Sequence, residues 1–384
     1  MSHQLPENPL QLQDLVIAGF RGIRKLTIGR LGRVTLLAGR NGVGKTTVLE
    51  AVRVFASRGS HATLRDLLQV RDEFLAANGG SQRIPMPDFS ALFYGRSPSG
   101  SRIVVGPTAT DEQLLVEDVD LTEELGPLIE ESFPEAAVNG RVVGLRAMFR
   151  GARQFLPVVG VPQELGGHIE FARAPGDAWR ILRQSTDDVT DSARIKCNSV
   201  GPGLMGNHEI ASYWEDVVLT PHETAVVEAL KLVMGERVQR VAVIGSNGHP
   251  RRQARAIVRL HGVDDRVPLK SLGDGAVRLF GVALALANSQ NGFLLIDEVE
   301  NGIHHSLQVD FWRMVLRTAR VNNVQVLATT HSFDCVRGFA EASSEFRDIG
   351  SALVRVARRD GEAWAIEYSE KDLTIAADQA IEVR

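Results

Sequence analysis

The sequence is poor in cysteine and in aromatic residues. Its 384 residues include only two cysteines, Cys197 and Cys335, and aromatic side chains make up 6% of the chain. Two cysteines far apart in the chain exclude a disulfide framework and fit a reducing compartment, so we expect a cytoplasmic protein. No aromatic residues are interleaved with the basic clusters, which argues against binding of single-stranded nucleic acid by base stacking.

Long apolar runs and an excess of basic charge are also lacking. The run "LFGVALALA" is far too short to span a bilayer, and the polar start carries no targeting or lipidation pattern, so we expect no membrane association. The formal net charge is −4, unlike that of a strongly basic nucleic-acid-binding protein, although a local basic patch stays compatible with it. What is present is ordinary globular composition, sufficient for one large domain or two.

The apolar pattern predicts an α/β protein. Residues 14–18, 25–28 and 34–38 are typical of short strands, and 45–56 of a helix. The strand-like segments "GFLLIDEV" and "VQVLATTH" flank a helix, which makes a βαβ unit and hence a parallel sheet. We divide the chain into an amino-terminal β lobe with the first helix (1–59), an insertion (60–220) and a carboxy-terminal α/β lobe (221–384).

The insertion is the least regular part of the sequence. The segments "ALFYGR", "SRIVVG" and "EQLLVEDV" are strand-like and are separated by turn residues, which predicts an antiparallel sheet. The segments "DLTEELGPLIEESF" and "DAWRILRQSTDDV" predict short helices. We therefore expect a mixed helical and β insertion.

The strongest motif is "GRNGVGKTT", which matches G-x-x-x-x-G-K-[ST] between a strand and a helix. In such a loop, successive backbone N–H groups turn toward phosphate oxygens, and the helix N-terminus adds partial positive charge. Lys45 would reach the β- and γ-phosphates, and the Thr46 hydroxyl would bind Mg²⁺. No N-K-x-D stretch is present, so we do not expect specificity for a guanine nucleotide.

Two buried strands end in polar residues that suit the same site. "FLLIDEVE" ends in Asp297, which suits the Mg²⁺ shell, and Glu298, which can orient or deprotonate the attacking water. "VLATTHSF" ends in Thr329, Thr330 and His331, and the histidine there can hydrogen-bond a γ-phosphate. Paired acids at a strand end are common, and a lone histidine is often a satisfied core residue. Beside a phosphate-binding loop, however, both segments favour catalysis.

A second candidate phosphate cradle is the stretch "SLGDGAVRLF". A serine and two glycines before a helix offer N–H donors and a hydroxyl to an anion, and a tight turn with a helix N-cap is the alternative interpretation. One chain does not need two cradles, so the second would serve a nucleotide bound by another copy. We therefore expect a dimer. Asp274 repels a γ-phosphate unless it points away or caps the helix, so hydrolysis is expected to be slow.

The order of these motifs resembles that of ABC-class ATPase heads. "FRGI", "SLGDGAVRL", "IDEVENGIHH" and "ATTHSFDC" are similar to the RecF/SMC/OLD branch, most of all to the OLD-type ATPases of bacterial defence and DNA processing. The resemblance covers residues 12–57 and 220–340. It implies an ABC-type ATPase head with a mostly parallel core sheet, an N-terminal antiparallel β lobe and a helical and β insertion. The residues that it places at the triphosphate are Asn41, Gly42, Val43, Gly44, Lys45, Thr46 and Thr47.

The resemblance also assigns roles outside the phosphate-binding loop. Its catalytic residues are Glu298 as base, His331 as switch histidine and Lys45, with Asp297 and Thr46 at the metal. It implies that Ser271, Gly273 and Gly275 meet the γ-phosphate of the opposite subunit, that Arg21 lies near the nucleotide, and that Asn301 and Gly302 form the D-loop. A glutamine should link the two lobes, and Gln154 and Gln163 are both open as candidates.

Several features of the sequence depart from the OLD-type pattern. OLD nucleases carry a metal-binding DxD motif near the carboxyl end, and none follows His331 here. "EDVD" at 117–120 has that spacing but lies before the ATPase core is complete, so we expect a solvated strand end. His304 and His305 lack a third ligand at metal-binding spacing. The arginines of "HPRRQARAIVRL" could contact a phosphate backbone or an acidic partner, with an exposed strand face as the alternative.

These features favour an ATP-dependent switch that serves a separate effector, a nuclease or toxin, in bacterial anti-phage defence. Three other functions stay open. One is a RecF-like DNA repair or maintenance ATPase whose closed dimer clamps DNA. Another is the ATPase subunit of a transporter, which the variant signature disfavours. The last is a scaffold that binds ATP and holds a toxin or other partner inactive.

Overall fold

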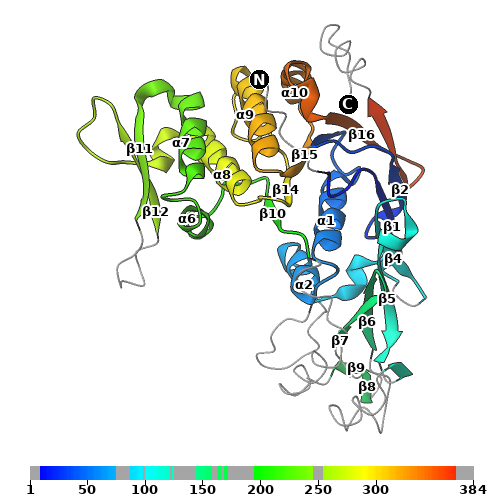
Figure 1. The fold of residues 1–384 in the computed structure, drawn as a ribbon. Helices are drawn as coiled ribbons and strands as arrows, with labels where there is room; N and C mark the ends of the chain where they lie inside the picture. The colour runs from blue at the N-terminus through cyan, green and yellow to red at the C-terminus, as the bar shows by residue number, and fades with distance from the viewer. Residues whose placement is uncertain are drawn as a thin grey trace.

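The computed structural model describes residues 9–74, 87–97, 100–121, 123–124, 143–157, 162–165, 168–171, 194–244 and 254–368. Two six-stranded sheets organise this part of the chain, together with two smaller sheets and the helices that cover them (Figure 1). The expected α/β fold is confirmed. Within the described ranges no helix has the length and apolar character needed to span a membrane. Most of the two helices predicted in the insertion lies outside the described residues.

The central sheet is the parallel one. Its strand order is β10 (Cys197–Val200), β14 (Phe293–Ile296), β15 (Gln325–Thr330), β3 (Val34–Ala38), β16 (Ser351–Arg359) and β17 (Glu362–Tyr368). Only β17 pairs antiparallel with its neighbour. Helix α9 (Gln308–Val321) connects β14 to β15, so the predicted βαβ unit is confirmed. Because β3 lies among strands from the carboxy-terminal half, the two halves share one sheet.

Both faces of the central sheet are buried, as parallel sheets require. Consecutive residues of β3 point to opposite faces: Leu36 joins one apolar core and Leu37 the other. The first core also contains the helices α8 (Asp274–Ala287), α9 and α10 (Phe333–Glu345). The second contains α1 (Lys45–Ala56), which lies between the central sheet and the antiparallel sheet. This packing explains why every residue of "VTLLA" and "FLLI" is buried.

The antiparallel sheet lies beyond α1. Its order is β2 (Ile23–Ile28), β1 (Leu15–Phe20), β4 (Arg102–Gly106), β5 (Leu114–Asp120), β6 (Val143–Phe149) and β7 (Ala152–Pro157). Helix α2 (His61–Val70) follows α1, and β8 (Pro162–Leu165) pairs with β9 (His168–Phe171) in a separate two-stranded sheet. The strand predicted at "ALFYGR" is wrong. Short 3₁₀ turns replace it, because the Asp88 side chain accepts a hydrogen bond from the Ser90 N–H and Gly95 has a φ of 69°.

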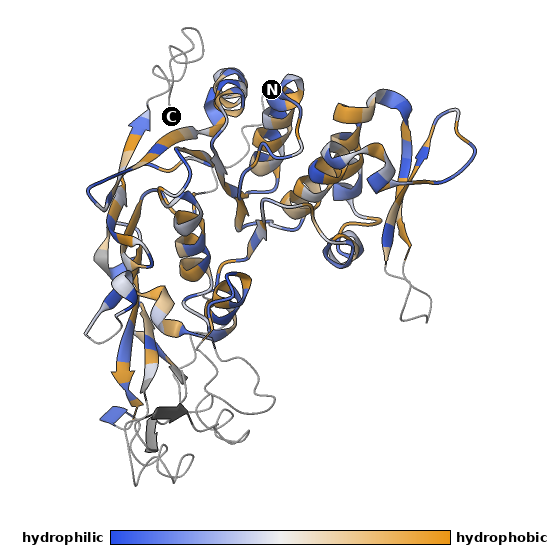
Figure 2. Ribbon diagram, turned by 180° about the vertical axis from the view of Figure 1, so that it is seen from behind, coloured by the Kyte–Doolittle hydropathy of each residue, from blue (hydrophilic) through white to orange (hydrophobic). Residues whose placement is uncertain are grey.

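A third sheet forms an arm on the side of the molecule away from the antiparallel sheet (Figure 1). Its strands are β11 (Val238–Ile244), β12 (Arg255–Leu260) and β13 (Val267–Pro268), and its helices are α6 (Asn207–Glu215) and α7 (Pro221–Met234). From β13 the chain passes through a 3₁₀ turn (Leu269–Leu272) into α8. Every residue of α8 from Ala276 to Ala287 is buried, and this helix is among the most apolar segments in Figure 2.

Candidate active site

The loop between β3 and α1 has the geometry of a phosphate cradle. Gly39, Gly42 and Gly44 have φ values of 148°, 76° and 109°, which L-amino acids with side chains rarely adopt. A Cβ at Gly39 would also lie 2.3 Å from the Val356 carbonyl oxygen. Gly44 is the N-cap of α1 and provides no side-chain hydrogen bond. The first N–H groups of α1 therefore lack a capping side chain, and they suit an anionic ligand.

Lys45 is buried at the start of α1. Its Nζ donates hydrogen bonds to the carbonyl oxygens of Gly39, at 2.7 Å, and Arg40, at 2.9 Å. Burial lowers the pKa of Lys45, and the nearby carboxylates of Glu300 and Asp297 act in the opposite direction. The ammonium is thus held inside the loop, where it can exchange carbonyl partners for phosphate oxygens.

Thr46 and Asp297 meet between α1 and the end of β14. The Thr46 hydroxyl lies 2.9 Å from Asp297 Oδ2, and Asp297 Oδ1 accepts a hydrogen bond from the Thr329 hydroxyl. A hydroxyl and a carboxylate at one point are a donor set that suits Mg²⁺, which takes one or two protein ligands and completes its shell with water and phosphate. No cluster of three or more His, Cys, Asp or Glu side chains that could hold a metal occurs in the described part of the chain. Thr46 and Asp297 fit the Mg²⁺ expected with a nucleotide, because this ion takes its other ligands from water and phosphate.

Glu298 is held in an unusual backbone conformation. Its φ is 47°, in the left-handed region that few residues other than glycine adopt. Its N–H donates to Thr329 Oγ1 at 2.8 Å, and its Oε2 accepts from Asn301 Nδ2 at 2.8 Å. Strain of this kind persists where neighbours over-determine the backbone, and it is concentrated at functional sites. The structure thus fixes the direction of the side chain expected to act as the base.

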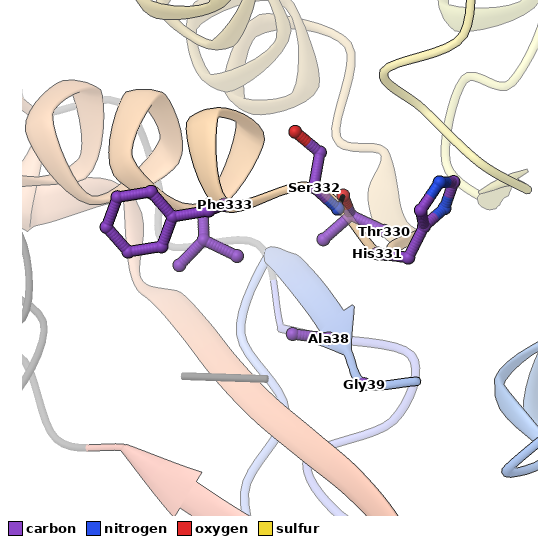
Figure 3. Close-up of a pocket in the computed structure, with 7 residues that line it drawn as sticks. Ala38, Gly39, Thr330, His331, Ser332 and Phe333 are labelled. Carbon is purple, nitrogen blue, oxygen red and sulfur yellow. Dashed lines mark hydrogen bonds between the residues drawn. The ribbon is translucent and has the colours of Figure 1, made fainter. Parts of the chain in front are cut away.

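His331 lies at the turn between β15 and α10, next to a small pocket (Figure 3). Ala38 and Gly39 line one side of this pocket, and Thr330 to Phe333 line the other. The backbone N–H of His331 donates to Glu300 Oε1 at 2.8 Å, and its Nδ1 lies 3.0 Å from the same oxygen. Glu300 therefore orients the histidine, whose side chain is 44% exposed.

The second candidate cradle lies at the surface. Ser271 and Gly273 are exposed, and Gly273 is the N-cap of α8 with a φ of 94°. Asp274 is the first residue of the helix, so it does not occupy the N-cap position, and a carboxylate in the first turn interacts favourably with the helix dipole. A Cβ at Gly275 would lie 2.8 Å from the Gly302 carbonyl oxygen. The turn therefore packs closely on the loop that follows Glu298.

Arg21 points away from the phosphate-binding loop. The turn that contains Arg21 lies beside this loop, since a Cβ at Gly44 would be 3.8 Å from the side chain of Ile23. The guanidinium, however, forms ion pairs with Glu50 at 2.9 Å and with Glu73 at 2.6 Å. Burial raises the pKa of Glu50, and Arg21 opposes that shift. In this conformation Arg21 joins α1 to the segment after α2, and its contact with nucleotide stays a prediction.

The two candidate glutamines lie in the insertion. Gln154 on β7 is the cross-strand neighbour of Ala147 on β6. A Cβ at Gly59 would lie 3.1 Å from the side chain of Ala147, and Gly59 follows the carboxyl end of α1. The phosphate-binding loop is at the other end of this helix, about 18 Å away at 1.5 Å per residue. Gln163 lies in the two-stranded sheet of β8 and β9. The segment next to the Asp297 strand is instead the loop after β10, which begins at Gly201.

The remaining candidate sites have structural partners. Glu117 lies within β5 and pairs with Arg146 and Arg102, so it is an ion-paired strand residue and not a solvated strand end. His304 and His305 are exposed, and their rings lie next to each other with centroids 4.2 Å apart and planes tilted by 38°.

Three residues that hold the site together were given no role from the sequence. Glu300 orients His331, and Thr329 bonds to both Asp297 and the Glu298 N–H. Arg278, on α8, donates to the carbonyl oxygens of Asp297 and Glu298 at 2.9 Å and 3.0 Å. A single charge within the apolar stretch "AVRLFGVALALA" is the signal that could have identified Arg278.

Comparison with known proteins finds relatives among ATPases. The model of the family described as "AAA domain, putative AbiEii toxin, Type IV TA system" matches residues 198–334. The DNA replication and repair protein RecF of Clostridioides difficile (strain 630) is 28% identical over 141 residues, which are 34% of this chain and 38% of RecF. The ATP/GTP phosphatase of Helicobacter pylori (strain ATCC 700392 / 26695) is 21% identical over 353 residues, 84% of this chain and 85% of that protein. Together with the motifs, these matches support an ABC-class P-loop ATPase related to RecF.

Among solved structures, the SMC head domain from Thermotoga maritima aligns with a TM-score of 0.41 and 16% identity, over 94% of this chain and all of that one. The match to RecF covers well under two thirds of that protein's length. For this ATPase, the narrower resemblance to OLD-type proteins stays a prediction.

Proposed function

We propose that the protein is an ATP-hydrolysing switch in which two copies close around two ATP molecules. Each ATP would lie between the phosphate-binding loop of one chain and the turn at Ser271, Gly273 and Gly275 of the other. The observation that carries this proposal is the exposed, uncapped start of α8. Its N–H groups have no side-chain cap, and a Cβ at Gly273 would meet nothing within 4 Å. This turn is therefore open to a ligand that a second chain brings.

The residues of the site divide the work of hydrolysis. Lys45 would leave the Gly39 and Arg40 carbonyls and bind the β- and γ-phosphates. Mg²⁺ held by Thr46 and Asp297 would neutralise charge on these phosphates. Glu298 would orient the attacking water and accept its proton. His331, oriented by Glu300, would donate a hydrogen bond to the γ-phosphate.

Hydrolysis is proposed to be slow. Asp274 follows Gly273 directly and is exposed. Its negative charge at the start of α8 would weaken the attraction of this helix end for a γ-phosphate. A closed dimer that persists for long suits a switch better than a motor, because the bound ligand then sets the population of the closed state.

The output of the switch is proposed to be a separate effector, a nuclease or a toxin, that acts in bacterial anti-phage defence. The description of the matching family names a toxin and a toxin–antitoxin system, which supports an effector of this kind. Purification of the tagged chain with ATP and Mg²⁺ tests this part of the proposal. A nuclease or toxin that co-purifies and is released after hydrolysis supports it, and an effector-free chain in cells challenged with phage contradicts it.

The closed dimer is tested with the variant Glu298→Gln, which keeps the shape of the side chain but cannot accept the proton. We expect this variant to be a monomer without nucleotide. With ATP and Mg²⁺ its mass in solution should double. Lys45→Ala is the matched control, and it should bind no ATP and stay monomeric. A Glu298→Gln protein that stays monomeric at saturating ATP contradicts the proposal, as does Lys45→Ala protein that keeps its ATP affinity.

A RecF-like role on DNA is the second candidate, and the arm provides the observation that favours it. Arg240 and Arg259 are directly opposite each other on β11 and β12, and Arg255 pairs with Ile244 on the same outer face. Arg266 precedes β13 at the position that continues the pairing opposite Arg259. All four arginines are exposed, and no ion pair of theirs is found within the described ranges. Like charges in cross-strand pairs are unfavourable unless an anion lies over them.

This second role predicts a specific salt dependence. If four arginines contact phosphates, the logarithm of the DNA association constant should fall with the logarithm of salt concentration with a slope of about −3.6, at about −0.9 per contact. Changing Arg240, Arg255, Arg259 and Arg266 to glutamine should abolish DNA-stimulated ATPase activity and leave basal activity intact. Equal DNA stimulation in this variant would exclude the arm as the DNA-binding surface.

A further inference from the structure

A buried arginine connects the start of α8 with the catalytic strand end. Arg278 is 1% exposed, yet its guanidinium makes four hydrogen bonds to backbone carbonyl oxygens. Nη1 donates to Gly201 and to Gly203, the latter at 2.9 Å, and Nη2 donates to Asp297 at 2.9 Å and to Glu298 at 3.0 Å. One side chain thus joins α8 to the loop after β10 and to the loop after β14.

A charge in this position is costly. Burial lowers the pKa of Arg278, and the carboxylates of Glu300, Asp297 and Glu298 act in the opposite direction. An apolar residue on a buried helix face commonly gives equal or better stability than a buried charge. The guanidinium offers what an apolar side chain cannot, because its planar fork holds two loops at fixed angles. The arrangement therefore points to a role in positioning.

The other end of this connection is the turn at the start of α8. Gly275 and Arg278 are three residues apart and lie on the same helix face. The Gly275 Cβ position lies 2.8 Å from the Gly302 carbonyl oxygen, so the turn, Arg278 and the loop of Glu298 are in continuous contact. The rest of α8 is buried. A shift of the turn is therefore transmitted along a rigid helix to the carbonyl groups of Asp297 and Glu298.

We propose that Arg278 is a positioning residue that transmits contact at the exposed turn to Glu298 of the same chain. This inference rests on the proposed ATP-closed dimer. In that dimer the turn of one chain touches the partner's ATP, whereas Glu298 of that chain acts on its own ATP. Arg278 therefore makes hydrolysis at each nucleotide depend on occupancy of the other. Arg278 donates to the carbonyl oxygen of Glu298, and Thr329 accepts from the Glu298 N–H. These two contacts hold the Glu298 backbone at its φ of 47°.

The variant Arg278→Lys tests this role, because lysine keeps the charge and loses the fork. We expect an unchanged ATP dissociation constant and intact ATP-dependent dimerisation in the Glu298→Gln background. The kcat should fall about 100-fold, the scale expected when a remote change misplaces a catalytic group by about 1 Å. Cooperativity in ATP should also disappear, with a Hill coefficient that falls to about 1. Arg317→Lys, an exposed change on α9, is the matched control and should behave as wild type.

The outcomes separate this inference from the proposed function. Glu298→Gln protein that stays monomeric at saturating ATP overturns the proposed function itself. Arg278→Lys protein that dimerises with ATP and keeps the wild-type kcat and Hill coefficient overturns only the role of Arg278. A variant that loses ATP binding and kcat together also overturns it, because the role would then be structural.

Hydrogen exchange provides a second test that needs no change at Arg278. In Glu298→Gln protein, ATP should increase protection at the turn of residues 271–275. Protection at residues 201–203 and 297–302 should increase with it. If the turn becomes protected while these two loops exchange as they do without nucleotide, the proposed connection through Arg278 is wrong.

Discussion

The hydroxyl of Thr329 offers a sharp test of how the site is held together. Thr329 is fully buried at the end of β15, and its Oγ1 bonds to Asp297 Oδ1 and accepts the Glu298 N–H. Thr329→Val keeps the shape and removes both bonds. A hydrogen bond to a charged group contributes about 1.5–3 kcal/mol, and an unsatisfied buried N–H costs about 1–3 kcal/mol. We therefore expect the free energy of unfolding to fall by about 2.5–6 kcal/mol.

Activity should fall for a separate reason. Without the hydroxyl, Asp297 and the strained Glu298 are both released, so kcat should fall about 100-fold, as expected for a misplacement of about 1 Å. Thr35→Val on β3 is the matched control, because Thr35 is equally buried and its hydroxyl bonds only within its own turn, to Gly32. Urea unfolding and steady-state ATPase assays measure both effects. If Thr329→Val keeps the kcat of Thr35→Val, the proposed role of Thr329 in positioning the carboxylates is wrong.

Three further predictions concern stability and reactivity. Arg21→Ala should lower the free energy of unfolding by about 3–5 kcal/mol, because it leaves Glu50 and Glu73 short of a buried partner; burial raises the pKa of Glu50, so the loss should shrink as pH falls and Glu50 is protonated, and an unchanged midpoint in urea at neutral pH would contradict it. Gly275→Ala should cost about 1–3 kcal/mol, because its Cβ meets the Gly302 carbonyl, and a thermal melt like that of wild type would contradict the close packing. Burial raises the pKa of Cys197 to about 12 and also raises that of Cys335, so both thiols stay protonated near pH 8, and alkylation followed by mass spectrometry should be slow until the protein is unfolded.

The sequence predicted the parts of this fold that depend on local pattern. The runs "VTLLA", "FLLI" and "QVLATT" are mainly apolar and lack a strict alternation with exposed polar residues, because every residue of these strands is buried. The glycines of the phosphate-binding loop stand where positive φ values are required. The spacing of the motif also predicted that Lys45 and Thr46 lie at the start of α1.

Other parts depend on contacts between distant residues. β10 is only four residues long and carries the polar sequence "CNSV", and it exists because it pairs with β14 about ninety-six residues later. Arg278 finds its partners Gly201 and Gly203 at separations of 77 and 75 residues. No local pattern predicts such a pair. The side chain of Arg21 illustrates the same limit, since its motif implies the nucleotide while its ion pairs lie with Glu50 and Glu73.

The most direct test of the central claim is a cross-link between chains. One sample would carry Ser271→Cys and another Asn41→Cys, each with Glu298→Gln and with Cys197→Ser to lower the background. After mixing, a short bis-maleimide should form covalent dimers between the two samples with ATP and Mg²⁺, and few without nucleotide. This result is expected if the turn before α8 of one chain lies against the phosphate-binding loop of the other. No cross-linked dimer at saturating ATP, or an equal yield without ATP, would contradict the account.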